Sequence, residues 1–289
     1  REFCYSSIWI RLMEMRETAG VKDTGKASGN GRPMGRVLLE YLKAERVGVK
    51  IDGLRKSFGD NHVLKGIDLE IDPGETVVIL GKSGMGKSVL LRHIIGLEKP
   101  DSGKIIIGGE DINDPDFSKN HVVSMVFQSS ALFNSLTVEE NVALYLKEHR
   151  VFDDARIRQI VSSALEIVGL EGKEEIMPSM LSGGMKRRVA TARALVMNPD
   201  LILFDEPTSG LDPMMTRTIG DLICDLKDKV EITQIVVTHD IELAFYVADR
   251  IAVISDGKII EYGTPEDIRR CKEEVVREFI TPQFEQPRR

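Results

Sequence analysis

The chain has 289 residues, of which 42% are apolar and 29% are charged. This balance is typical of a globular protein with one large domain or two smaller ones. No apolar run approaches the roughly 20 residues of a membrane-spanning helix, so we expect any membrane role to need a partner. The formal net charge of −7 disfavours nonspecific nucleic-acid binding. The three widely spaced cysteines predict neither a metal site nor a disulfide framework.

The first 45 residues differ from the rest of the chain. The stretch ETAGVKDTGKASGNGRP, at 17–33, is rich in Gly, Lys and Ser and offers little apolar surface to bury. We therefore expect 1–45 to be a disordered extension. The regular pattern of strands and helices is predicted to run from 46 to 265, and a C-terminal extension to follow at 266–289.

The first predicted elements are strands. RVGVKI (46–51) and GIDLEI (66–71) alternate apolar and polar residues, as half-exposed antiparallel strands do. TVVIL (76–80) is a continuous apolar run, which suits a strand covered on both faces. It leads into the Gly-rich stretch GKSGMGKS (81–88), and SVLLRHIIGL (88–97) follows with helical spacing.

The Gly-rich stretch predicts a phosphate-binding loop, because strand, glycine loop and helix form the context that such a loop requires. Its glycines let backbone N–H groups turn toward phosphate oxygens, and the following helix start attracts the same anion. Lys87 would reach the β and γ phosphates, and the Ser88 hydroxyl would ligate Mg²⁺. The nucleotide-binding residues expected here are Gly81, Lys82, Ser83, Gly84, Met85, Gly86, Lys87 and Ser88.

The middle of the chain is predicted to be mostly helical, from about 135 to 195, after a strand and turn in GKIIIGGEDI (103–112). Its clearest helix lies in 153–170, where apolar residues recur at helical spacing. Asp153 or Asp154 is expected to cap that helix, and Gly169 to end it.

Strands return in the last third of the chain. LILFDEP (201–207) and QIVVTHD (234–240) are apolar runs that end in acidic or titratable residues. RIAVISDGKIIEYG (250–263) predicts a β-hairpin with its turn at Asp256 and Gly257. The sequence therefore predicts an α/β core, interrupted by a helical insertion.

Polar side chains follow three of the predicted strands. Asp205 is suited to hold Mg²⁺ through water, and Glu206 to polarise an attacking water. His239 could hydrogen-bond the γ-phosphate or that water, because ligands bind at the carboxyl ends of parallel strands. Gln128, at the end of VFQ, could reach Mg²⁺ or the same water.

A second glycine-fronted helix start lies at Ser182, Gly183 and Gly184 in LSGGMKRRVATARAL (181–195). A helix cap would explain Ser182 but not the two glycines, so we interpret this segment as a second anion site. One chain with two half-sites suggests that the second half-site faces a nucleotide held by another copy.

This ordered set of motifs resembles the ATP-binding cassette (ABC) family. GKSGMGKS resembles Walker A, VFQ the Q-loop, LSGGM the signature, LILFDE Walker B, SGLD the D-loop and TH the H-switch, across roughly 47–265. The resemblance implies a P-loop NTPase core with an antiparallel β subdomain and an inserted α-helical subdomain at about 129–195. It also implies hydrolysis of ATP with Mg²⁺, with Glu206 as catalytic carboxylate and His239 as its partner.

The resemblance further implies a homodimer of cassettes packed head to tail. Each ATP would then lie between one Walker A loop and the partner's signature segment. Phe58 would stack on the adenine, although Tyr is commoner there. Ser182 and Gly184 would contact the γ-phosphate in the opposite subunit, and Asp212 would cross the dimer interface.

A finer resemblance lies in FQSSALFNSLTVEENVALYLKEH (127–149) and LSGGMKRRVATARAL (181–195), which look like segments of Mla/Mce-type phospholipid transporters. It implies three kinds of partner: a separate permease, an Mce-domain lipid-binding protein and a small accessory subunit. It also implies that the chain itself lies peripherally at the cytoplasmic face of the inner membrane. The tail at 266–289 resembles that subgroup's partner-contacting extension, with a frayed tail as the alternative. An amino-acid or other small-solute importer stays open as an alternative function, as does a soluble non-transport ABC ATPase.

Overall fold

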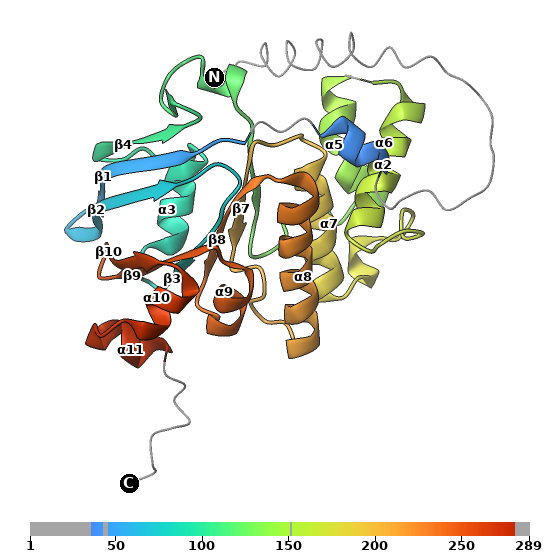
Figure 1. Cartoon of the computed structure of the whole chain (residues 1–289). Coiled ribbons are helices and arrows are strands. Elements are labelled where there is room, and N and C mark those ends of the chain that lie inside the picture. Colours follow the sequence, from blue (N-terminus) through green and yellow to red (C-terminus); the bar gives the residue numbers. More distant parts are fainter. Residues whose placement is uncertain (1–35, 43–45, 151, 281–289) are drawn as a thin grey trace.

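The computed structural model describes residues 36–42, 46–150 and 152–280, in which helices pack around two β-sheets (Figure 1). The predicted α/β fold class is confirmed, because one sheet is antiparallel and the other is mostly parallel. Within these ranges, no helix combines the length and the apolar character that crossing a membrane would demand.

The antiparallel sheet has the strand order β2-β1-β4-β5. Its strands are β1 (Val49–Phe58), β2 (Asn61–Ile71), β4 (Ser102–Ile107) and β5 (Glu110–Asp111). Alternate residues of the paired ends of β1 and β2 are buried, as the period of two in the sequence predicts. These buried side chains pack against α3 and the second sheet.

The second sheet has the strand order β10-β9-β3-β8-β7-β6. Every residue of β3 and β8 is buried, which is why these strands read as continuous apolar runs. Its strands are β3 (Thr76–Leu80), β6 (Val123–Val126), β7 (Leu201–Asp205), β8 (Thr233–Thr238), β9 (Arg250–Ser255) and β10 (Lys258–Gly263).

Helices α5, α6 and α7 pack on one another beside the sheets (Figure 1). Asp153, of the two candidates, caps α6, since its Oδ1 accepts the Arg156 N–H at 2.8 Å. The longer helices are α3 (Lys87–Ile94), α5 (Val138–His149), α6 (Asp154–Ile167), α7 (Gly183–Leu195) and α8 (Pro213–Val230). The shorter ones are α4 (Phe117–Asn120), η1 (Pro178–Met180), α9 (Ile241–Val247), α10 (Pro265–Arg270) and α11 (Glu274–Ile280).

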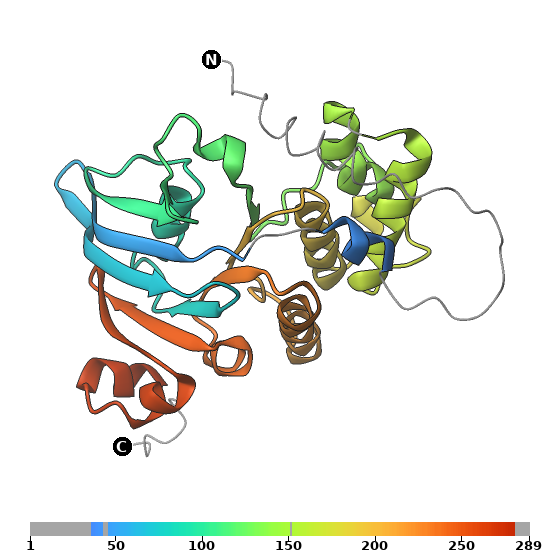
Figure 2. The ribbon, with the colours of Figure 1, turned by 45° about the horizontal axis from the view of Figure 1, so that its top comes forward.

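Helix α2 (Arg36–Tyr41) shows that the prediction of disorder for the whole of 1–45 is wrong. Leu38 is fully buried, and its N–H donates to Ser163 Oγ at 2.9 Å. The Tyr41 hydroxyl donates to the Val196 carbonyl at 2.9 Å. Both ribbon views place α2 beside α6 (Figures 1 and 2). The rest of that prediction, like the last nine residues of the predicted tail, lies outside the described residues.

Five parallel strands, β9, β3, β8, β7 and β6, end at one edge of the second sheet. Leu80 at the end of β3 pairs with Thr238 at the end of β8, and Asp205 at the end of β7 pairs with Val237. The segments that follow these strands therefore meet in space, although more than 150 residues separate Leu80 from Thr238 in the sequence. This edge is where ligands bind in open parallel sheets.

Candidate functional site

A cavity of about 480 Å³ opens at this edge of the sheet. The Gly-rich loop, the start of α3, the ends of strands β7 and β8 and the β1–β2 hairpin all contribute to its wall. The lining residues are Phe58, Val63, Ser83, Gly84, Gly86, Lys87, Ser88, Val89, Gln128, Glu206, Ser209 and His239. The structure thus brings together most of the predicted site, with Phe58 nearly half exposed at the rim.

The Gly-rich loop takes a conformation that requires glycine. Gly84 and Gly86 have φ values of 83° and 92°, which side chains with a Cβ atom rarely adopt. Gly86 occupies the N-cap of α3 and offers no capping side chain, so the first N–H groups of the helix stay available to an anion. Three residues predicted to bind nucleotide, Gly81, Lys82 and Met85, are not among the lining residues.

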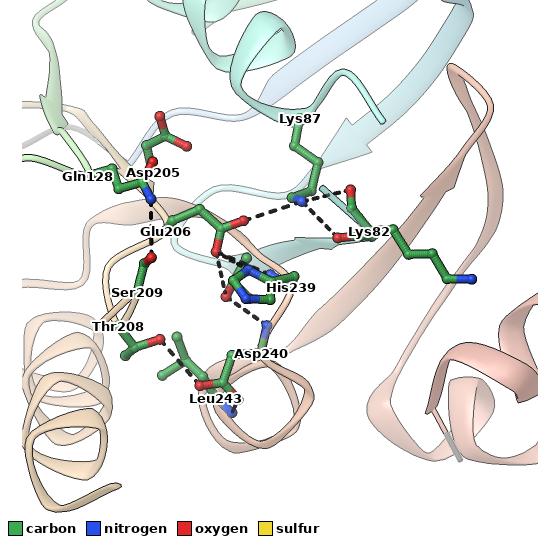
Figure 3. A network of polar contacts seen from close by, with 12 residues as sticks. Lys82, Lys87, Gln128, Asp205, Glu206, Thr208, Ser209, His239, Asp240 and Leu243 are labelled. Atoms are coloured by element: carbon green, nitrogen blue, oxygen red, sulfur yellow. Dashed lines mark hydrogen bonds and ion pairs between the residues drawn. The ribbon is translucent and has the colours of Figure 1, made fainter. Parts of the chain in front are cut away.

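Lys87 is the buried cation of the site, with 5% of its surface exposed. Its Nζ donates to the Gly81 carbonyl at 2.7 Å and to the Lys82 carbonyl at 3.1 Å. It also pairs with Glu206 Oε1 at 3.3 Å (Figure 3). The Lys82 side chain extends away from the carboxylates in Figure 3, so of these two lysines it is Lys87 whose charge lies beside Glu206.

Ser88 and Asp205 are two of the three residues, with Gln128, that the sequence predicts to hold a metal ion. Ser88 Oγ donates to Asp205 Oδ1 at 2.9 Å. Burial raises the pKa of Asp205, the charge of Glu206 adds to that effect, and the hydrogen bond from Ser88 opposes it. Within the described part of the chain, no three His, Cys, Asp or Glu side chains gather as a metal site. A hydroxyl and a single carboxylate fit Mg²⁺, which usually keeps several waters and takes its other ligands from substrate phosphates.

Glu206 is held between Lys87 and His239. Its Oε2 lies 2.7 Å from His239 Nδ1 and accepts the Thr238 hydroxyl at 3.3 Å (Figure 3). Its backbone has a φ of 47°, a left-handed conformation that costs free energy in a residue other than glycine. Glu206 is 8% exposed, whereas about half of the His239 side chain is open to solvent. The carboxylate is therefore fixed, while the imidazole faces the cavity.

Gln128 contacts a residue that the sequence did not single out. Its Nε2 donates to Ser209 Oγ at 3.1 Å. A second unforeseen residue, Arg187, donates to the carbonyls of Phe127 at 3.0 Å and Ser209 at 3.3 Å. A helical projection carried the signal for Arg187, because it shares a buried stripe of α7 with the small residues Gly184, Thr191 and Ala194.

The second glycine-fronted helix start lies outside this cavity. Ser182 caps α7 by accepting an N–H of the first turn at 3.3 Å. A Cβ on Gly183 would lie 3.2 Å from Leu211, and one on Gly184 would lie 2.8 Å from the sulfur of Met215. These glycines therefore permit close packing of α7 against the start of α8, and their φ values are not left-handed.

Asp212, predicted to cross a dimer interface, caps α8 within the single chain. Its Oδ1 accepts the Met215 N–H at 2.9 Å. None of Ser182, Gly183, Gly184 and Asp212 is among the described residues that line the cavity.

A family model described as "ABC transporter" matches residues 64–209. The probable ribonucleotide transport ATP-binding protein mkl of Mycobacterium tuberculosis is 38% identical over 274 residues, 92% of this chain and 73% of the relative. The Fe(3+) ions import ATP-binding protein FbpC of Photobacterium profundum is 43% identical over 220 residues, 76% of this chain and 62% of the relative.

A solved structure supports the fold assignment. The ATP-binding cassette MJ0796, described as a dimer in a post-hydrolysis state bound to ADP and Pi, is similar with a TM-score of 0.68 and 34% identity. The alignment covers 75% of this chain and 98% of that one.

Proposed function

The chain belongs to the ABC transporter family, and we propose on that premise that it energises a separate membrane permease that moves phospholipid. The coarser statement rests on the family itself: the chain is an ATP-binding subunit of an ABC transporter and an ATPase. One observation carries the assignment of chemistry to residues. Nζ of the buried Lys87 lies 3.3 Å from Oε1 of Glu206, whose backbone is strained. Both residues line a cavity at the start of α3, where the N-cap has no capping side chain.

Several residues in and beside this cavity have proposed tasks in ATP hydrolysis. Lys87 and the first N–H groups of α3 bind the β and γ phosphates. Ser88 and Asp205 hold Mg²⁺, which would neutralise phosphate charge. Glu206 takes a proton from the attacking water. His239, beside that carboxylate, is placed to hydrogen-bond the γ-phosphate, and Phe58 offers its exposed ring to the base.

We propose that the working unit is a head-to-tail homodimer. The cavity is lined by the Gly-rich loop and three carboxyl-end segments, but not by Ser182, Gly183 or Gly184. In the proposed dimer these three residues cover the nucleotide of the other copy, and Asp212 lies at the interface. The description of the similar cassette MJ0796 as a dimer bound to ADP and Pi supports a dimeric working unit.

Closure of the dimer would supply the mechanical step. A nucleotide contacted by both copies binds better in the closed state, so it shifts the population toward closure, and hydrolysis removes that bias. We place the subunit at the cytoplasmic face of the inner membrane, against the permease. An Mce-domain protein and a small accessory subunit complete the proposed assembly.

Phospholipid is proposed as the cargo because segments 127–149 and 181–195 resemble the Mla/Mce type. A specific observation favours a second candidate, the import of a small solute. The match to mkl, a probable ribonucleotide transport protein, covers 92% of the chain, and FbpC is a Fe(3+) importer subunit. These relatives differ in cargo while sharing the cassette, so the cassette's chemistry does not select between them.

The test is purification from native membranes in mild detergent, followed by mass spectrometry of subunits and small molecules. Phospholipid with an Mce-domain protein is the expected result. A solute-binding protein without phospholipid would overturn the lipid proposal and support the importer. A matched preparation carrying Lys87→Ala distinguishes cargo that needs nucleotide from detergent-carried lipid.

A further inference from the structure

Two neighbouring arginines of α7, Arg187 and Arg188, have opposite surroundings. Arg187 points its guanidinium at the loops that border the cavity, through the carbonyls of Phe127 and Ser209. Arg188 donates to the carbonyls of Val168 and Gly169 at the end of α6, on the other side. Arg187 is buried and Arg188 is half-buried, and burial lowers the pKa of both.

Arg187 joins two segments that carry site residues. Phe127 directly precedes Gln128, and Gln128 itself reaches Ser209 Oγ at 3.1 Å. Ser209 belongs to the turn after β7, because its N–H donates to the Glu206 carbonyl at 3.1 Å. The two hydrogen bonds of Arg187 and the one of Gln128 therefore tie the loop after β6 to the turn after Glu206. We call these three hydrogen bonds the bracket.

The position of Arg187 along α7 connects this bracket to the glycine-fronted helix start. Arg187 lies three residues after Gly184, which packs against Met215 in α8. A helix is stiff over one turn, so a displacement of its first residues also displaces the guanidinium. Because a guanidinium is a planar fork, it can donate to two carbonyls at once and hold their relative position.

Keeping Arg187 in this place costs free energy of folding. It is 7% exposed, and its Nε is buried without a hydrogen-bond partner among the described residues. Burying a charged group with an unsatisfied donor opposes folding. The nearby charge of Asp205 offsets part of that cost, since it raises the pKa that burial lowers.

We propose that Arg187 is a positioning residue for ATP hydrolysis. It fixes the positions of Gln128 and of the turn at Ser209 relative to the start of α7. Among the described residues, its guanidinium makes no hydrogen bond or ion pair with Ser88, Gln128 or Asp205, the predicted metal ligands, or with Glu206, and it does not line the cavity. Its action is to set where Gln128 and the backbone after Glu206 lie. The proposal rests on the ATPase assignment but not on the cargo, so a failed lipid test leaves it standing.

The experiment compares Arg187→Met with Arg188→Met in the full chain. Both changes remove a guanidinium and keep a long apolar side chain. We expect kcat for ATP to fall about tenfold to a hundredfold in Arg187→Met, as small misplacements of catalytic groups do. The Kd for ATP should change less than about threefold, and Arg188→Met should keep the wild-type kcat, because it leaves the bracket intact.

A second readout does not depend on turnover. Backbone hydrogen exchange should become faster at 127–131 and 207–211 in Arg187→Met, and stay unchanged there in Arg188→Met. Arg187→Lys is expected to be intermediate, because an ammonium keeps the charge but loses the fork. It also serves as the test variant if Arg187→Met does not fold.

Three results would overturn the proposal. One is a wild-type kcat in the folded Arg187 variant. Another is an equal loss of kcat in Arg188→Met, which would indicate general destabilisation of α7. The third is faster exchange spread over the whole of α7 rather than confined to the two bracketed segments.

Discussion

The chain contains two helix starts fronted by glycine and serine, and the structure treats them in opposite ways. At α3 the glycines have left-handed φ values, the N-cap has no side chain, and two carboxylates of the same chain lie nearby. At α7 the glycines are helical, Ser182 supplies its own cap, and Gly184 packs tightly against Met215. The first helix start therefore has the geometry of the proposed phosphate site, with acids beside it, whereas the second packs within its own chain and would face a nucleotide only in the proposed dimer.

The largest expected effect is a loss of ATP turnover when the acid beside the first helix start is changed. Glu206→Gln keeps the size of the side chain but removes the base, so turnover should fall by about a hundredfold or more. ATP binding should persist, and a nucleotide-bound dimer should accumulate in size-exclusion chromatography with excess ATP. Phosphate release measures the loss. Glu242→Gln, an exposed acid in the first turn of α9, should behave as the wild type.

The next effect tests whether the two helix starts act on different copies. Lys87→Ala disables the first start, and Ser182→Arg crowds the second, so each variant alone should lack turnover. If the sites form between copies, a mixed dimer keeps one intact site, and an equal mixture should recover about a quarter of wild-type activity. An activity that stays at zero at every mixing ratio would argue that both starts serve the same copy's nucleotide.

A smaller effect distinguishes the two uses of glycine. Gly86→Ala forces a Cβ into a left-handed conformation, which costs about 1–2 kcal/mol, and it also crowds Val63 and Leu64. Gly184→Ala meets only the flexible Met215 and gains helix propensity, so its cost should stay within about 1 kcal/mol. Urea unfolding measures both. Adding Met215→Ala should relieve Gly184→Ala, whereas trimming Val63 should not relieve Gly86→Ala.

The smallest effect is a pH dependence confined to the first site. Because burial raises the pKa of Asp205, protons compete with Mg²⁺ at a higher pH than they would at an ordinary aspartate. The Mg²⁺ requirement for nucleotide binding should therefore rise as pH falls, with an onset above the usual aspartate range. Titration with a fluorescent ATP analogue between about pH 5 and 8 measures this. Asp205→Asn should bind Mg²⁺ weakly throughout and show no such onset.

The first helix start could be predicted from the sequence because its information is local. The apolar run at 76–80, the glycines after it and the following helical spacing are contiguous, and the ends of β7 and β8 carry their acids in the same way. Parallel pairing of buried strands then brings Asp205, Glu206 and His239 to one edge without further assumptions.

The parts that were missed depend on contacts between distant segments. Helix α2 has six residues, too few for a periodic pattern. Its Leu38 and Tyr41 form hydrogen bonds with the distant residues Ser163 and Val196. Arg187 was hidden in the charged run MKRR, since its partners are backbone carbonyls that no side-chain motif marks. The prediction of disorder rested on the low apolar content of 17–33, and it was extended too far toward the first strand.

At the proposed nucleotide site, the contacts of Lys87 would make nucleotide binding an exchange of partners. An ammonium has three donors, and those of Lys87 are directed at two carbonyls of its own loop and at Glu206. A phosphate that binds Lys87 would therefore replace Glu206 or a loop carbonyl as its partner. The affinity for nucleotide would then reflect the difference in free energy between the old contact of Lys87 and the new one. Displacing Glu206 would also separate that carboxylate from the Lys87 ammonium. Binding of the nucleotide would then free the proposed base to accept a proton.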